Sequence, residues 1–377
     1  MLTVNGRLQL CRVRWHCPAD GSETLIDRLL DQFESTISAG VREMACRLDQ
    51  SSTSFQATAD NLWSTAHIKV SKETVRKLVE SEGKRVLRLL DRAEIGPDWS
   101  AQDCQTDEGP SRVYLGCDGV KVPLVTDAEK KKRRQNILAK RRRRGRKCKP
   151  LPRSKAGADC AYKEFRIGYL YNQSKSNRFV GVTSGNHEKA GRMLRRMSDQ
   201  VDLQQADEKV ANIDGAPWIR NQIEFHGLTE DIGLDFYHLR DYAQKTRRAV
   251  FGEDSAAGES WLKDLMHSVR HEGYNAGWEQ LVAWRKSLRG TKRTAANSLL
   301  HYMSERSSMI RYPEFRSHGW DIGSGPTEAE CKTTTHRVKG RGRRWNSANA
   351  EAMMGLAALK DSGLWQKYWT SPDTETN

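Results

Sequence analysis

Three acidic residues occupy positions where a carboxylate could take part in metal-dependent chemistry. Asp118 follows the apolar run VYLGC, Asp214 follows KVANI, and a glycine comes after each of them. Short apolar runs of this kind predict strands, so both acids are expected at strand ends. Glu328 follows the turn GSGP, and the spacing of Thr327 and Glu330 fits a capping box, which predicts Glu328 in the first turn of a helix.

Together these carboxylates suit divalent metal ions. Hard cations such as Mg²⁺ or Mn²⁺ prefer oxygen ligands and keep water molecules that a substrate phosphate can displace. Two such ions can activate the attacking oxygen of a phosphodiester reaction and stabilise the leaving oxygen. Each acid alone has an ordinary interpretation as a turn residue or as a partner of a helix dipole. The presence of all three in one basic chain favours the metal site.

The positive charge of the chain is concentrated in one segment. The 377 residues carry a formal net charge of +15, from 63 Lys and Arg against 48 Asp and Glu. Residues 130–155 hold 15 of these cations and no acid, so they account for the whole excess. A localised basic segment favours nucleic acid as partner, although a solvated loop or a localisation signal has the same composition. We expect a mobile excursion from the core, because its few apolar residues cannot offset the entropy of ordering.

Residues 51–95 have the pattern of a helix-turn-helix DNA-binding domain. An apolar face from Phe55 to Trp63 precedes a turn at 67–69, and Ser71 is placed to cap a second helix over 72–82. The outward face of that second helix carries cations that suit phosphates beside a major groove. A helical hairpin that only packs has the same pattern, so both interpretations stay open. The predicted DNA-binding residues here are Lys72, Arg76 and Lys77.

The rest of the chain is predicted to form a sheet domain interrupted by helices. Apolar runs predict strands at 113–118, 165–171, 178–182, 209–214 and 232–237, with helices at 187–204 and 218–225. Strands that then alternate with helices indicate an α/β class. The expected domain order is a hairpin and a helix (24–47) within 1–50, the helix-turn-helix, a linker at 96–111, a core at 112–240, a helical insertion at 241–316, the completion of the core at 317–365 with one Ala-rich helix, and a polar tail at 366–377.

Composition excludes several other classes of protein. There is no run of about 18 apolar residues, the length that a membrane-spanning helix needs, so no membrane partner is expected. The start MLTVNGRLQLCRVRW has no apolar stretch of the kind found in secretory signals. The 8 cysteines form no CxxC pair, so neither a zinc ribbon nor a disulfide framework is indicated. We expect a cytoplasmic protein that associates with the nucleoid.

Four motifs resemble those of DDE transposases, and more closely those of insertion-sequence transposases of the Kra type, which are related to the Mutator superfamily. The motifs are YLGCDGVKVPL, VANIDGAPWI, LDFYHLRD and GWDIGSGPTEAECKTTTHRVKGRGRRW. The resemblance implies an RNase H-like catalytic core with an all-α insertion and a helical N-terminal DNA-binding domain. It implies Asp118, Asp214 and Glu328 as the metal-binding triad. Asp235 and His238 match a D-x-x-H signature of the Mutator-like relatives, and a buried structural role remains the alternative for His238.

Several cations follow Glu328 closely in the sequence. Lys332 and Lys339 come four and eleven residues after Glu328, which predicts that they lie on its side of a helix. There they could hold phosphates near the metal ions, and a contribution to solubility is the alternative. The same basic tract continues with Arg341, Arg343 and Arg344.

The expected function is that of an insertion-sequence transposase. It would bind terminal inverted repeats, hydrolyse the phosphodiester at the ends of the element with Mg²⁺ or Mn²⁺, and join the 3′-OH to target DNA as a homo-oligomer. Two alternatives remain open from the sequence. One is a DNA-binding remnant without catalytic activity, and the other is an RNase H-like nuclease that cuts without joining.

Overall fold

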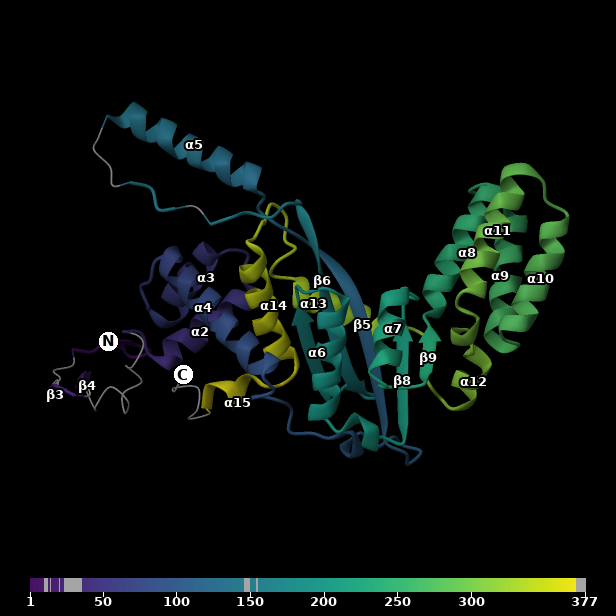
Figure 1. Ribbon diagram of the computed structural model, residues 1–377, viewed down its shortest axis with the longest axis horizontal. Helices are drawn as coiled ribbons and strands as arrows, with labels where there is room; N and C mark the ends of the chain where they lie inside the picture. The colour runs from purple at the N-terminus through teal and green to yellow at the C-terminus, as the bar shows by residue number, and fades with distance from the viewer. Residues whose placement is uncertain are drawn as a thin grey trace.

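The computed structural model describes residues 1–9, 13, 15–19, 21–23, 36–145, 150–153 and 155–370. It is a mixed α/β structure in which a five-stranded sheet lies between two groups of helices (Figure 1). N-terminal helices lie on one side of the sheet and an all-α bundle lies beyond its opposite edge. No helix in the described part of the chain is long and apolar enough to cross a membrane.

The sheet has the spatial order β7-β6-β5-β8-β9. β5 pairs antiparallel with β6, and β6 with β7, whereas β5–β8 and β8–β9 are parallel. Most residues in the middle of these strands are buried, as in a sheet covered on both faces. The strands are β5 (Arg112–Pro123), β6 (Tyr162–Asn172), β7 (Arg178–Thr183), β8 (Glu208–Ile213) and β9 (Asp231–Leu234).

β5 is about twice as long as the sequence predicted. It pairs with β8 only as far as Leu115, but it stays paired with β6 up to Pro123. The expectation that Asp118 ends a strand is therefore wrong, because the β5–β6 ribbon continues after β8 has ended. Asp118 lies within this ribbon, opposite Ile167. The strand predicted at 232–237 is shorter in the structure, since β9 ends at Leu234 and a helix begins two residues later.

Helices cover the two faces of the sheet, and strand alternation decides which side chain meets which helix. Gly168 of β6 lies under Leu194 of α6 (His187–Gln200) on one face. Gly116 of β5 faces Thr327 of α13 (Gly325–Thr335) on the other. α7 (Pro217–Phe225) packs beside α6 and is joined to β8 by a short turn.

An all-α bundle stands beyond β9 (Figure 1). Its longer helices meet through aromatic side chains, among them Trp261 and Trp284, whose ring centroids are 4.3 Å apart. The bundle returns the chain to the sheet through a short last helix. The helices are α8 (Phe236–Phe251), α9 (Ala256–His271), α10 (Tyr274–Lys286), α11 (Gly290–Ser304) and α12 (Tyr312–Ser317).

The described residues of the N-terminal part form two short hairpins and three helices. The helix predicted at 24–47 begins only at residue 39, where Ser38 caps it; residues 24–35 lie outside the described residues. Ser71 caps the last helix as predicted, and that helix continues well beyond the expected residue 82. The elements are β1 (Leu2–Thr3), β2 (Gly6–Arg7), β3 (Trp15–Cys17), β4 (Gly21–Glu23), α2 (Ala39–Ser51), α3 (Phe55–Ala66) and α4 (Lys72–Asp91).

The second half of α4 packs into the core of the protein. Gly83 lies against the backbone of Ala352 in α14 (Ser347–Asp361), so closely that a Cβ on Gly83 would be 2.3 Å from the carbonyl oxygen of Ala352. α14 is almost completely buried because it fills the space between α4 and β7. The tail expected at 366–377 is helical up to residue 370, where α15 (Trp365–Thr370) buries Trp365; residues 371–377 are not among those described.

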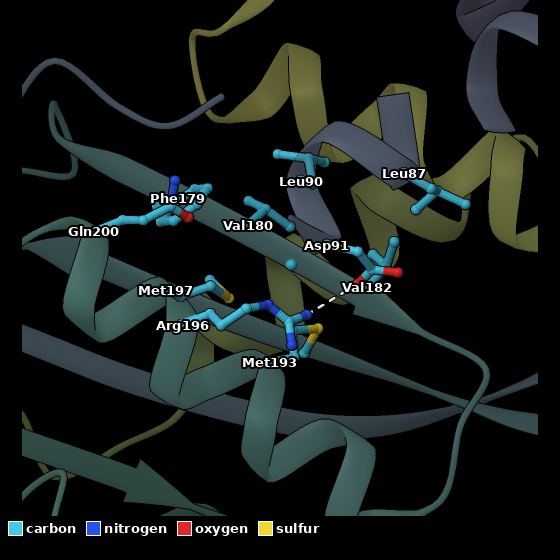
Figure 2. A pocket seen from close by; sticks show the side chains of 11 residues that line it. Leu87, Leu90, Asp91, Phe179, Val180, Val182, Met193, Arg196, Met197 and Gln200 are labelled. Carbon is cyan, nitrogen blue, oxygen red and sulfur yellow. Dashed lines mark hydrogen bonds and ion pairs between the residues drawn. The ribbon is translucent and has the colours of Figure 1, made fainter. Parts of the chain in front are cut away.

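Figure 2 shows how the end of α4 meets the edge of the sheet. Leu87 and Leu90 of α4 lie over β7 and line one pocket with its residues Phe179, Val180 and Val182. Asp91 pairs with Arg196 of α6 at 2.9 Å. The cavity left between them is only about 20 Å³. This packing ties the N-terminal helices firmly to the sheet.

The basic segment forms a helix that projects from the sheet. α5 (Asp127–Arg144) begins with a capping box between Thr126 and Glu129, and none of its residues is buried. It lies apart from the sheet and the other helices (Figure 1). The excursion predicted from the sequence is therefore helical over most of its length, because capping and the helix formers Lys, Arg and Ala favour a helix even without packing. Residues 146–149 and 154 lie outside the described part.

Candidate active site

α13 packs closely against β5 because residue 116 of β5 is a glycine. A Cβ on Gly116 would lie 1.8 Å from Oγ1 of Thr327, so only glycine allows this close approach. Asp118 is two residues further along β5 and shares the face of Gly116. Glu328 follows Thr327 in the first turn of α13. The contact therefore brings the two predicted acids to the same face of the sheet.

The Asp118 side chain is half-buried and surrounded by other acids. One carboxylate oxygen accepts a hydrogen bond from the backbone N–H of Gly119 at 2.6 Å. Burial raises the pKa of Asp118, and the negative charges of Asp214 and Glu328 raise it further. The charges of the other two predicted carboxylates therefore both act on Asp118.

Asp214 is the residue that follows β8, as the sequence predicted. Its carboxylate accepts the backbone N–H of Ala216 at 2.8 Å and closes the turn that leads into α7. Gly215 has a φ of +83°, a conformation that L side chains rarely adopt. The carbonyl of Gly215 accepts a hydrogen bond from Arg306 of the bundle at 3.0 Å, which fixes the turn from outside the sheet.

Asp235 connects the end of β9 to the turn before Glu328. Its side chain is 1% exposed, and it accepts hydrogen bonds from the backbone N–H of His238 at 2.8 Å, the hydroxyl of Ser324 at 2.7 Å and the backbone N–H of Ser324. Burial would raise the pKa of Asp235, but these donors outweigh it and lower the pKa to about 2. Asp235 is thus a charged hub that positions the start of α13.

His238 lies between two carboxylates. Its Nδ1 is 3.3 Å from an oxygen of Asp235 and 3.9 Å from an oxygen of Glu328. The contact with Asp235 raises the pKa of His238, and the charge of Glu328 adds to that effect. The side chain is 38% exposed although its Nδ1 atom is buried, so His238 is half-buried and both interpretations stay open.

Glu328 lies in the first turn of its helix, but the capping box predicted there is absent. Ser324 occupies the N-cap position, and Thr327 is already inside the helix. The hydroxyl of Ser324 donates to Asp235 instead of capping α13. Glu330, the predicted partner in that box, is buried and accepts a hydrogen bond from Thr334 at 2.9 Å instead. The Glu328 side chain is 41% exposed.

A cavity of about 560 Å³, here called the carboxylate cavity, opens at this place. Asp118 and Glu328 are on its wall, and Asp214 lies outside the lining. Lys332 and Lys339 line the cavity too, so both predicted cations face the acids. Among the other lining residues, the charged or aromatic ones that were not predicted are Lys121, Tyr237 and Asp241. Their signals were available, since Lys121 lies within the Asp118 motif and the other two flank His238.

The basic residues after Glu328 lie in other places than the sequence predicted. α13 ends at Thr335, so Lys339 is not on the Glu328 helix and reaches the cavity from the loop that follows. Arg343 donates to the carbonyl of Arg337 at 2.7 Å and holds this loop together. Arg344 pairs with Glu129 of α5 at 2.7 Å. Arg341 is exposed and lies outside the lining of the cavity.

The predicted DNA-facing residues of α4 are not equivalent. Lys72 and Lys77 are exposed at the start of the helix. Arg76 forms ion pairs with Glu73 at 2.5 Å and with Glu80 at 2.6 Å, so its charge is already balanced by two carboxylates. A phosphate contact by Arg76 would therefore have to displace these acids.

The donor set at the carboxylate cavity fits a hard divalent cation. Asp118 and Glu328 on its wall would supply oxygen ligands, and a cation there would relieve the repulsion that Glu328 exerts on Asp118. Asp214 also acts on Asp118, but it lies outside the lining. Ligand atoms of Asp235, His238 and Glu328 also lie within 4.8 Å of one another. In that second group the Asp235 oxygens already accept hydrogen bonds from N–H and O–H donors, so Asp235 positions its neighbours. Glu328 is the accessible carboxylate of this group.

Known proteins offer only a distant likeness to this chain. No protein-family model matches it, and no curated protein matches it either. Among solved structures, the Drosophila P element transposase strand transfer complex is similar over 91% of this chain and 83% of that chain, with 10% sequence identity and a TM-score of 0.29. Values this low establish neither a common family nor a common fold.

Proposed function

We propose that this protein is a DDE transposase of an insertion sequence, an enzyme that cuts and joins DNA with divalent metal ions. The observation that carries the proposal is the position of three acids from separate parts of the chain, because the charges of Asp214 and Glu328 both act on Asp118 and raise its pKa. Two of them line a cavity together with lysines. Carboxylates beside cations suit a substrate whose phosphate must approach bound metal.

The topology supports the same proposal. Antiparallel strands β7, β6 and β5 followed by parallel strands β8 and β9 have the order of an RNase H-like core. In this order β5 and β8 are neighbours, which supports an approach of Asp118 on β5 to Asp214 at the end of β8. The all-α bundle enters the chain after β9, between the second and the third acid.

Bound Mg²⁺ or Mn²⁺ would activate the attacking oxygen and stabilise the leaving oxygen of the phosphodiester. The protein would contribute the remaining parts. Asp118, Asp214 and Glu328 would hold the ions, and Lys332 and Lys339, which line the same cavity as Asp118 and Glu328, would contact the phosphates. Asp235 raises the pKa of His238, and His238 orients the Glu328 carboxylate.

The test is metal-dependent cutting and joining of DNA. A plasmid carrying the sequences that flank the gene on both sides should be nicked and joined to a second plasmid with Mg²⁺ or Mn²⁺, but not with EDTA. The single changes Asp118→Asn, Asp214→Asn and Glu328→Gln should each lower the rate at least about 100-fold. Asp264→Asn removes an exposed carboxylate on α9 and is the matched control.

Each other outcome identifies one of the alternatives. Cutting without joining would indicate a nuclease. DNA binding without either reaction, under all metal conditions, would indicate a remnant. Activity that survives all three substitutions would place the chemistry elsewhere in the chain.

A further inference from the structure

A second cavity, of about 360 Å³, lies between α8 and α9 and is here called the α8–α9 pocket. Its volume is in the range of small-ligand sites. Tyr237 lines both this pocket and the carboxylate cavity, and its side chain is 60% exposed. The two cavities are thus neighbours that share the Tyr237 side chain at the start of α8.

The lining of the α8–α9 pocket is strongly cationic. Arg240, Lys263 and Arg270 line it and are exposed, and none of them forms an ion pair with any residue that the structure describes. The acid on the wall, Glu259, is 3.3 Å from Arg247, which balances its charge. Arg270 lies over the ring of Phe236, with 5.8 Å between the guanidinium carbon and the ring centroid.

Two histidines that line the pocket lie in the same positive potential. The rings of His267 and His271 are stacked with centroids 4.4 Å apart. Desolvation lowers the pKa of His271, and the charges of Arg316, His267 and Arg270 lower it further. Cations this close repel one another, and an anion in the pocket would remove the repulsion.

We infer that the α8–α9 pocket binds the phosphodiester backbone of the nucleic-acid strand that leaves the carboxylate cavity. The inference rests on the proposed function for the identity of that strand. Arg240 and Lys263 contact its phosphates, and the exposed ring of Tyr237 offers a face on which a base can stack. The bundle would then position the strand, and the carboxylates would act on it.

Salt-dependent DNA binding tests the pocket without any catalytic step. Binding of a fluorescein-labelled single-stranded oligodeoxynucleotide of mixed sequence is measured by anisotropy over a series of NaCl concentrations. Arg240→Gln with Lys263→Gln should flatten the slope of log K against log[salt] by about 1 to 1.5, since each lost phosphate contact on a single strand contributes about 0.7. Each single change should give about half of that effect.

The matched control removes the same charge from the same bundle. Lys286→Gln with Lys292→Gln changes exposed lysines on α10 and α11 that line neither cavity. Its slope should equal that of the unchanged protein. Equal slopes for the control and the pocket variant would overturn the inference, because only the general charge of the bundle would then matter.

A second measurement uses the unchanged protein and so does not depend on how the variants fold. Acetylation of surface lysines is followed by mass spectrometry with and without the oligonucleotide. Lys263 should be protected by DNA and Lys286 should not. Protection of Lys263 in a protein that shows no metal-dependent cutting would contradict the proposed reaction and leave the pocket in place. Equal labelling of Lys263 with and without DNA would contradict the pocket.

Discussion

At the scale of single residues, the charge of Asp118 is the clearest feature of the candidate site. Its pKa is raised by burial and by neighbouring acids, so the ionised form destabilises the folded protein at neutral pH. The folded state binds a proton more readily than the unfolded state, and stability therefore falls as the pH rises from the unfolded pKa through the folded one.

The first prediction concerns this penalty. Asp118→Asn should raise the melting temperature in metal-free buffer at pH 7, because it removes a charge that is repelled by Asp214 and Glu328. The gain should shrink as the pH falls below the folded pKa of Asp118. Calorimetry at several pH values measures it, with Asp264→Asn as the control on an exposed surface. A lower melting temperature at neutral pH would show that the carboxylate is stabilised by other contacts.

The second prediction separates a positioning role from a metal-binding role for Asp235. A pKa of about 2 lies below the ordinary 3.8, and a difference of that size is worth about 2 kcal/mol. This stability is present above about pH 4 and is lost as the pH falls towards 2. Asp235→Asn should therefore lower the free energy of unfolding by about 2 to 4 kcal/mol at pH 7, measured by urea titration without metal. Unchanged stability would mean that Asp235 is not the hub of the Ser324 turn.

At the scale of elements, α5 is a helix without a packing partner inside the described protein. Several hydrogen bonds and an ion pair near its base join it to the rest of the protein. Lys130 donates to the carbonyl of Ala156 at 2.6 Å, and Glu129 pairs with Arg344 at 2.7 Å. The end of the helix carries Arg141–Arg144, where cations interact favourably with the helix dipole. Neighbouring like charges oppose the helix, and phosphates would relieve that repulsion.

The third prediction is that α5 is a DNA-binding arm that the core does not need. Replacing residues 130–153 by a short Gly-Ser linker should leave the melting temperature within about 2 °C, since no residue of α5 is buried. The slope of DNA affinity against salt should become much shallower, because up to about ten phosphate contacts are lost. In the unchanged protein, trypsin should cleave this segment first, and bound DNA should protect it. Unfolding on deletion would show that α5 belongs to the core.

At the scale of the whole molecule, the candidate site depends on contacts between distant parts of the chain. Arg337 lies between the end of α13 and Lys339, and it makes a buried bidentate ion pair with Asp49 of α2 at 3.0 and 3.1 Å. Phe55 and Trp345 both lie against its guanidinium. The N-terminal helices therefore support the loop that follows the Glu328 helix, and the bundle supports the Asp214 turn through Arg306.

The fourth prediction follows from metal binding by the folded protein alone. Mg²⁺ or Mn²⁺ should raise the melting temperature in a concentration-dependent way, by an amount that corresponds to about 2.7 kcal/mol at roughly a hundred times the dissociation constant. NaCl at equal ionic strength should not reproduce the rise. Glu328→Gln should weaken it strongly, and Asp264→Asn should not. A metal effect that is the same in all three proteins would exclude Glu328 as a ligand.

The sequence by itself determined most of the elements and the candidate acids. Apolar runs predicted β6, β7 and β8 to within a few residues, and the Asp-Gly and Gly-rich signals were enough to single out Asp118, Asp214 and Glu328. These features are local, because strand alternation, caps and turns depend on neighbours in the chain. The helicity of α5 was not predicted, because its composition argued only against a packed core and said nothing against a solvated helix.

Only the tertiary structure decided how those elements meet. The length of β5 depends on its partner β6, the close approach of α13 depends on the missing side chain of Gly116, and the role of Asp235 depends on Ser324, 89 residues away. The α8–α9 pocket likewise exists only where two helices of the bundle lie side by side. Such contacts are absent from any local pattern, because they arise when packing and buried hydrogen bonds select one arrangement of the whole chain.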